Sequence, residues 1–71
     1  MMTLGENICA RRKALGMTQR QLGEACGKEG RSGEVTVQHW EHDRQEPSMK
    51  DLRPLCRALQ CTLEELIPPE N

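Results

Sequence analysis

Hydrophobic residues recur every three or four positions along most of this chain, which is the spacing of one face of an α-helix. The first such stretch runs from Leu4 to Leu15, with Thr3 as a cap at its start and Gly16 as a stop after its end. Arg12 lies beside this apolar stripe. An arginine in that place needs a carboxylate partner if it is partly covered.

A second amphipathic stretch runs from about Gln19 to Cys26, with Leu22 on its apolar face. Thr18 is a favourable N-cap residue, and Gln21 three positions later completes a capping box. The sequence therefore predicts a short second helix that begins directly after Thr18.

The segment from Gly27 to Gly33 contains three glycines and predicts a mobile loop. We expect a third helix to begin at Ser32 or Gly33 and to end at about Glu41 or His42.

Val37 and Trp40 form the apolar stripe of this third helix. Val35, Thr36 and Val37 in succession would favour a strand on propensity alone. No other segment of the chain could pair with such a strand, so we interpret these residues as helical.

A polar turn from His42 to Pro47 precedes a fourth helix, for which Ser48 and Asp51 predict a capping box. Pro54 lies inside this helix and should kink it or shift its start. The expected buried stripe of this helix is Leu52, Leu55, Cys56 and Leu59.

A short fifth helix is expected after Thr62, which forms another capping box with Glu65. We expect Leu63, Leu66 and Ile67 to face inward. Five short helices and no strand predict an all-α class, a compact five-helix bundle in a single domain of residues 1–71 with its core in residues 4–67.

The composition indicates a small core, because a chain of 71 residues buries only about 60% of its unfolded surface. Trp40 is the single aromatic residue and should be the largest contributor to that core. No apolar run approaches the ~18 residues of a membrane span, and we expect no leader. We expect a soluble, cytoplasmic protein without a membrane partner.

The charge is unevenly distributed, although the net charge is −1. Basic residues gather in the first half, namely Arg11, Arg12, Lys13, Arg20, Lys28 and Arg31. Acidic residues lie at the end, namely Glu64, Glu65 and Glu70. The balance excludes non-specific attraction over the whole surface to nucleic acid, but it allows a locally basic face.

The four cysteines do not have the spacing of a zinc motif, because no pair is separated by two residues. We interpret them as small, reduced, mostly buried side chains and expect no metal. No Ser-His-Asp or Cys-His arrangement is evident, and so small a chain has little room for a pocket. We therefore expect no enzyme activity, no cofactor and no small-molecule ligand.

The third helix has a buried side and a polar side. Glu34, Thr36, Gln38 and His39 lie between its apolar positions and can make directed hydrogen bonds. A short helix of this kind suits the major groove of double-stranded DNA.

Three groups of residues together resemble the phage-repressor/Cro-type helix-turn-helix family. They are Arg12 with the run Gly16–Gln19 and Leu22, then Val37, Trp40, Glu41, Pro47 and Ser48, and then Leu52, the run Leu55–Leu59, Thr62, Glu65 and Leu66. The resemblance covers residues 4–67. It implies a five-helix bundle in which the second and third helices form the helix-turn-helix, the third being the recognition helix.

The resemblance also implies roles for single residues. The positions that face the groove are Glu34, Val35, Thr36, Gln38 and His39. Gln19 would touch the DNA backbone and brace a side chain of the recognition helix, and Arg12 would form a partly buried ion pair with Glu41. The turn from His42 to Arg44 would lie along a phosphate. Apart from the resemblance, Arg20 at a helix N-terminus and Lys28 and Arg31 in the expected loop are candidates for further backbone contacts.

Three features depart from the family pattern, and one of them is the absence of the hydrophobe-Ser pair that usually follows the turn glycine. Leu22 and Trp40 are 18 positions apart, about four more than is usual in such motifs. We place the four extra residues in an enlarged turn, Lys28–Gly33. Asp43 also replaces the glycine that usually follows the recognition helix.

These observations predict a sequence-specific regulator that binds double-stranded DNA and represses by occupying its operator. One domain buries little surface, so we expect a homodimer on a two-fold operator, formed weakly or only on DNA through the fourth and fifth helices. The alternatives are an antitoxin-like or other protein-interaction module of the same fold, or one domain of a longer regulator.

Overall fold

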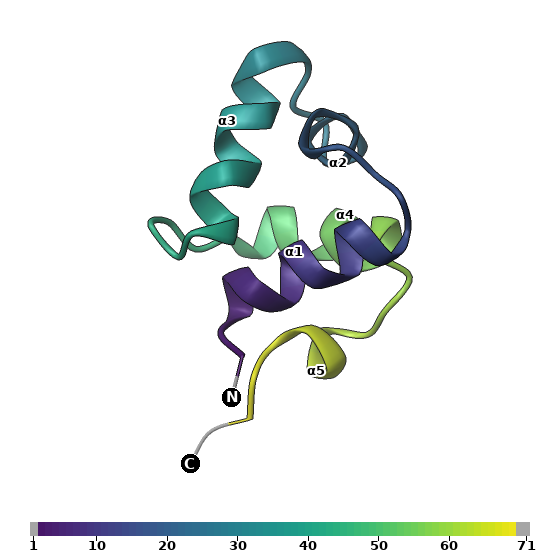
Figure 1. The fold of residues 1–71 in the computed structure, drawn as a ribbon, viewed down its shortest axis with the longest axis vertical. Helices are drawn as coiled ribbons and strands as arrows, with labels where there is room; N and C mark the ends of the chain where they lie inside the picture. The colour runs from purple at the N-terminus through teal and green to yellow at the C-terminus, as the bar shows by residue number, and fades with distance from the viewer. Residues whose placement is uncertain (1, 70–71) are drawn as a thin grey trace.

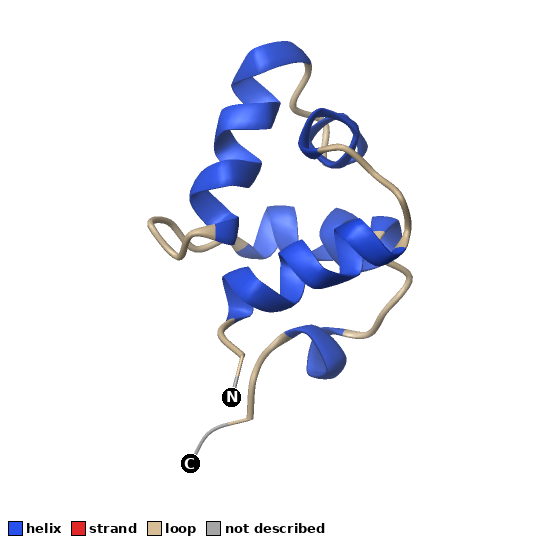
Figure 2. Ribbon diagram, viewed as in Figure 1, coloured by secondary structure: helices blue, strands red, loops and turns tan. Residues whose placement is uncertain are grey.

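The computed structural model describes residues 2–69, so Glu70 of the acidic end lies outside the described part. It contains the helices α1 (Leu4–Ala14), α2 (Gln19–Ala25), α3 (Gly30–Glu41), α4 (Met49–Ala58) and α5 (Leu63–Leu66). Residues 2–69 form no strand, and short loops join the helices (Figure 2). The predicted all-α five-helix bundle is confirmed.

The N-termini of α1, α2 and α5 are fixed by capping boxes. Those of α2 and α5 are the predicted ones, and Thr3 forms the third with Glu6. The box predicted for α4 is wrong. Ser48 is the N-cap residue there, but its hydroxyl donates to the Asp51 carboxylate at 3.1 Å and accepts no backbone N–H.

Each of α1 to α4 ends in a Schellman motif, in which a residue with positive φ lets the chain turn back on the helix. The positive-φ residues at these four helix ends are Gly16, Gly27, Asp43 and Gln60. The N–H of the next residue then bonds a carbonyl five positions earlier, as in the Met17–Arg12 bond of 3.1 Å at the end of α1. Two of the four turns are therefore built without glycine.

The core is one cluster to which every helix contributes, and Trp40 is only 2% exposed within it. Its members are Ile8, Leu22, Val37, Trp40, Leu52, Leu55, Leu59 and Leu66. Three residues expected to face inward do not: Leu15, Leu63 and Ile67 are each about 40% exposed. Since α5 is a single turn, it can bury only Leu66, and the chain is extended at Ile67.

The glycine-rich segment differs most from expectation. The predicted loop to Gly33 ends at Glu29, because α3 begins at Gly30 and so contains most of the four extra residues. Gly33 is buried against Gly23 of α2, where a Cβ on Gly23 would lie 2.7 Å from the Gly33 carbonyl carbon. The glycines therefore allow two helix backbones to touch.

Other local expectations can be compared directly with the structure. Helix α4 starts at Met49 and runs through Pro54, so the proline does not shift its start. The four cysteines are free thiols of intermediate burial, less covered than expected. Each helix in residues 2–69 is too short or too polar to cross a lipid bilayer.

Candidate nucleic-acid interface

Helix α3 stands at the edge of the molecule beside α2, with one side turned away from the other helices (Figure 1). Its buried side consists of Gly33, Val37, Trp40 and Glu41. The opposite side is a stripe of residues four positions apart, which we call the outer stripe: Arg31, Val35 and His39. Val35 is 36% exposed, Arg31 is exposed and His39 is half-buried, so the stripe is most open to solvent in its first two turns.

The other predicted base-reading residues lie on the two shoulders of the outer stripe. Gln38 lies on the shoulder next to α2, where its Nε2 donates to Gln19 Oε1 at 3.2 Å. Glu34, one turn earlier, shares that shoulder and is half-buried. Thr36 lies on the other shoulder and donates its hydroxyl to the Ser32 carbonyl at 2.9 Å, which commits its proton to the helix itself.

A chain of hydrogen bonds connects the core to this surface. Arg12 donates from Nε and Nη2 to the two carboxylate oxygens of Glu41 and from Nη1 to the Met17 carbonyl at 2.8 Å. Gln19 then donates from Nε2 to Glu41 Oε1 at 3.0 Å and accepts from Gln38. The structure thus brings Arg12 and Glu41 together and uses Gln19 as a brace for Gln38.

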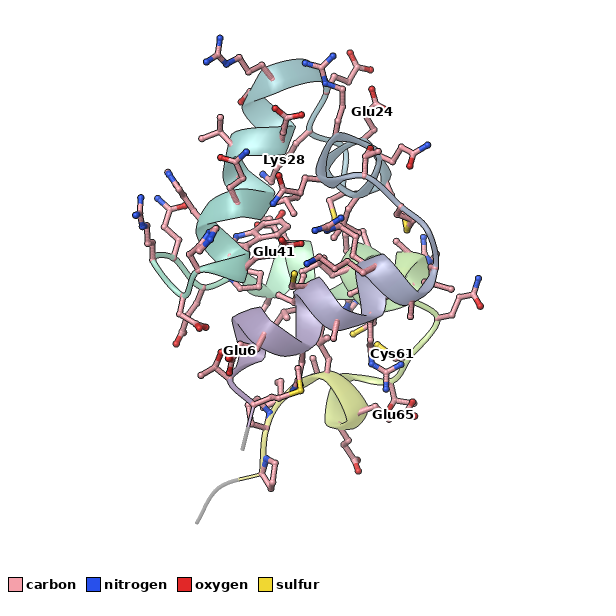
Figure 3. All side chains as sticks on the ribbon, viewed as in Figure 1. Glu6, Glu24, Lys28, Glu41, Cys61 and Glu65 are labelled. Atoms are coloured by element: carbon pink, nitrogen blue, oxygen red, sulfur yellow. The ribbon has the colours of Figure 1, made fainter. Side chains whose placement is uncertain are left out.

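Charge is stabilised inside this network. Burial acts to raise the pKa of Glu41, but hydrogen bonds from Arg12 and Gln19 outweigh it and hold that pKa below its ordinary value. The same bond to Glu41 raises the pKa of Arg12, although burial opposes it. Both groups are therefore charged at neutral pH, and the pair fixes the rotation of α3 relative to α1. Figure 3 shows Glu41 pointing from α3 towards the region between α1 and α2.

The predicted backbone-contact residues lie in different settings. Arg20 and Arg44 are exposed at the start of α2 and in the turn after α3. His42 Nδ1 lies 2.8 Å from the Gln38 carbonyl, a contact that needs the proton on Nδ1. Lys28 instead contacts Asp51 of α4, with Nζ 3.5 Å from Oδ1. Arg31 belongs to the first turn of α3 and not to a loop.

Asp43 has a structural role that sequence reasoning missed. Its carboxylate accepts from the Gly5 N–H at 2.9 Å and from the Thr3 hydroxyl at 2.6 Å, so it holds the start of α1 against the end of α3. Gly5 allows this approach, because a Cβ there would lie 2.4 Å from the Trp40 carbonyl oxygen. Aspartate both caps helices and tolerates positive φ, and these two properties were the available signal.

Comparison with known families settles what kind of domain this is. The model of the helix-turn-helix family matches residues 10–66, which is most of the chain. The chain belongs to the helix-turn-helix family. In this helix-turn-helix domain, α2 and α3 are the paired helices and residues 26–29 are the turn.

Two curated relatives carry the same kind of domain. Repressor protein C2 of Salmonella phage P22 is 38% identical over 64 residues, which are 90% of this chain and 28% of that protein. The HTH-type transcriptional regulator DicA of Escherichia coli (strain K12) is 41% identical over 61 residues, 86% of this chain and 42% of that protein. The helix-turn-helix chain thus spans less than half the length of either relative.

A solved structure matches the whole helix-turn-helix domain. It is a crystal structure of the P22 c2 repressor protein in complex with synthetic operator 9T in the presence of Tl+. The TM-score is 0.86 at 34% sequence identity, and the match covers 99% of this chain and all of that one.

Among residues 2–69, no cluster of three or more histidines, cysteines or acidic residues could hold a metal ion.

Proposed function

We propose that this domain is a sequence-specific DNA-binding repressor that acts by occupying an operator. The observation that carries the proposal is the close match to the P22 c2 repressor solved on an operator, together with the free, polar outer side of α3. A repressor acts where the DNA is, so the proposal places the protein in the cytoplasm. Occupancy requires no bond to form or break, so no catalytic residue is assigned.

In the proposed complex α3 enters the major groove as the recognition helix. Gln38 bonds adenine in bidentate fashion, Glu34 accepts from a cytosine amino group, and Val35 or Thr36 contacts a thymine methyl. His39 also faces the bases. Gln19 restricts Gln38 to one orientation, and a side chain held in place before binding loses less entropy when it bonds a base.

Phosphate contacts hold the domain in register on the duplex. Gln19 and Arg20 lie at the N-terminus of α2, where free N–H groups and the helix dipole favour a phosphate oxygen. His42 is the C-cap residue of α3, and Arg44 is exposed in the turn after it. Lys28 is the weakest of the proposed contacts, because it already has Asp51 as a partner.

A homodimer on a two-fold operator completes the proposal. An apolar surface formed by Met49 of α4, Leu63 of α5 and Ile67 just after α5 is left exposed, and a hollow of about 440 Å³ lies between the two helices. Arg53 and Arg57 flank the α4 side of this α4–α5 surface, and Glu64 flanks the α5 side. Opposite charges on two edges of one patch allow it to pair with a second copy of itself.

Selection of bound sequences from a pool of random duplexes tests this function. We expect an enriched two-fold motif whose affinity falls steeply with salt, because phosphate contacts release counterions. A pool that emerges without a preferred sequence would contradict the proposal. Binding to a protein partner with little salt dependence would instead support the alternative of an antitoxin-like interaction module.

Single substitutions separate base reading from backbone contact. Replacing Gln38 or His39 with alanine should reduce discrimination between sites, by about 5- to 100-fold for a lost bidentate contact. Arg44→Ala should weaken all sites alike and lower the salt slope by about one. If the Gln38 and His39 variants select the same motif as the parent, the reading face is assigned wrongly.

A further inference from the structure

The extra turn of α3 lengthens the side of the helix that faces away from the core. Arg31 precedes Val35 by four residues, so the outer stripe of α3 continues through it. Arg31 lies one turn nearer the N-terminus of α3 than Val35, so the two Cα atoms are about 6 Å apart along the helix axis. The side chain is exposed, and among residues 2–69 it takes part in no ion pair.

The turn that carries Arg31 is anchored on two sides. Gly33 packs directly against Gly23 of α2, with no side chain between the two backbones. Lys28, just before the turn, contacts Asp51 of α4 with Nζ 3.5 Å from Oδ1. The Lys28 N–H also bonds the Gly23 carbonyl at 2.9 Å, which closes the end of α2. The turn is therefore a fixed extension of the helix.

We infer that Arg31 is a specificity-determining residue that reads a guanine beyond the bases contacted by Val35. The inference rests on the proposed function and assigns to Arg31 a base contact in place of a phosphate contact. A guanidinium bonds guanine O6 and N7 with two parallel N–H groups, the commonest specific contact in the major groove.

The position of Arg31 on the helix favours the base over the backbone. Residues near the N-terminus of a recognition helix contact base edges, whereas phosphates are reached from its flanks and from neighbouring turns. Arg31 precedes Val35 by four residues and Gln38 by seven, so it lies on the same side of α3 as both of these proposed base contacts. A displacement of about 6 Å corresponds to nearly two base-pair steps, so the half-site is extended by one read position.

The test is a sequence selection carried out in parallel with the parent chain and the variants Arg31→Ala, Arg31→Lys and Arg20→Ala. The parent should enrich a guanine at one end of each half-site. Arg31→Ala should lose that preference by about 5- to 100-fold while the rest of the motif stays the same. Arg31→Lys keeps the charge but not the fork of two donors, so it should lose most of the preference as well.

Arg20→Ala is the matched control. It removes an exposed arginine at the start of α2, and it should weaken binding to every DNA sequence alike. A second readout uses a duplex with 7-deazaguanine at the read position, which lacks the N7 acceptor. That duplex should bind the parent more weakly than the guanine duplex, and Arg31→Ala should bind both equally.

The possible outcomes separate this inference from the proposed function. If Arg31→Ala weakens all sequences uniformly and Arg31→Lys restores binding, Arg31 is a phosphate contact and the inference is overturned. An unchanged motif in both Arg31 variants would overturn it too. If the parent shows no sequence preference at all, the proposed function fails and the inference fails with it. Melting curves of each variant verify that the fold is kept.

Discussion

Glu41 is the residue at which three helices meet. It accepts from Arg12 of α1 and from Gln19 of α2, and it lies on α3 with a side chain only 3% exposed. Removing one partner of such a pair leaves an uncompensated buried charge, which costs about 3–5 kcal/mol. Because Gln19 also bonds Gln38, the same carboxylate orients a side chain of the proposed reading face.

The network predicts a loss of stability in acid. Since the pKa of Glu41 is lower in the folded state than its ordinary value of 4.5, its contribution is complete above that pH. That contribution is lost as the pH falls from 4.5 through the lower folded-state pKa. Urea unfolding at pH 7, 4.5 and 3.5 should show a steeper decline for the parent than for Glu41→Gln, which is already destabilised at pH 7.

Two comparisons make this prediction specific to the pair. Glu65 also has a lowered pKa, through hydrogen bonds at its capping box, but it is exposed on α5. Glu65→Gln should therefore leave most of the acid response in place. Replacing both Arg12 and Glu41 with apolar residues should cost less than either single change, and equal or larger loss in the double variant would contradict a coupled ion pair.

At the scale of elements, Asp43 connects the end of α3 to the start of α1. It tolerates φ of 58° and its carboxylate accepts two hydrogen bonds from the first turn of α1. We expect Asp43→Ala to lose about 2 kcal/mol, because it loses the cap and keeps an unfavourable backbone conformation. Asp43→Gly should lose less stability than Asp43→Ala, and Asp43→Asn should lose less than Asp43→Gly. Thermal melting measures these differences. If Asp43→Gly is as stable as the parent, the carboxylate contacts contribute nothing.

Local signals in the sequence predicted most of the helix starts, because a capping box depends on residues three positions apart. The glycine-rich segment could not be predicted in this way. Glycine favours loops, but it also allows close approach of two backbones, and only the partner decides between these uses. Gly23 lies ten positions before Gly33, so the contact between them is invisible to any local pattern.

The same ambiguity limited the prediction of the site. The base-reading candidates from Glu34 to His39 fall on α3 because the spacing of Val37 and Trp40 fixes that part of the helix. Lys28 and Arg31 were assigned by their place in an expected loop. Once α3 starts at Gly30, Arg31 joins the outer stripe and Lys28 is left facing Asp51.

The Gly23–Gly33 contact gives a prediction about α2 and α3 together. Gly23→Ala places a Cβ 2.7 Å from the Gly33 backbone, which cannot give way as a side chain can. We expect a loss of about 1–3 kcal/mol and weaker DNA binding, because α3 must shift. Gly27→Ala is the control. A Cβ at Gly27 would have no atom within 4 Å, so its loss of stability comes only from placing alanine at a φ of 80°. Native DNA affinity in Gly23→Ala would show that the spacing of α2 and α3 does not set the interface.

At the scale of the whole molecule, the proposed reading surface and the proposed pairing surface are separate. The outer stripe is on α3, whereas α5 lies at the opposite end of the bundle from the first turn of α3 (Figure 1). Leu63 is exposed on α5, and Ile67 is exposed directly after it. A single small module buries roughly 600–1,000 Å² on DNA, which is little for strong discrimination. Two copies joined through the α4–α5 surface would double the number of bases read.

If two copies pair through this surface, a substitution in it should abolish cooperative binding to a full operator and leave the binding of one copy to a half-site unchanged. Leu63→Lys should leave binding to an isolated half-site unchanged and abolish the cooperative step on a two-fold operator, because the same patch is disrupted in both copies. Leu15→Lys is the matched control, since Leu15 is 40% exposed and Leu63 38% exposed, but Leu15 lies at the end of α1. Gel-shift titrations on full and half operators measure both steps. Cooperativity that survives Leu63→Lys, or disappears in Leu15→Lys, would place the pairing surface elsewhere.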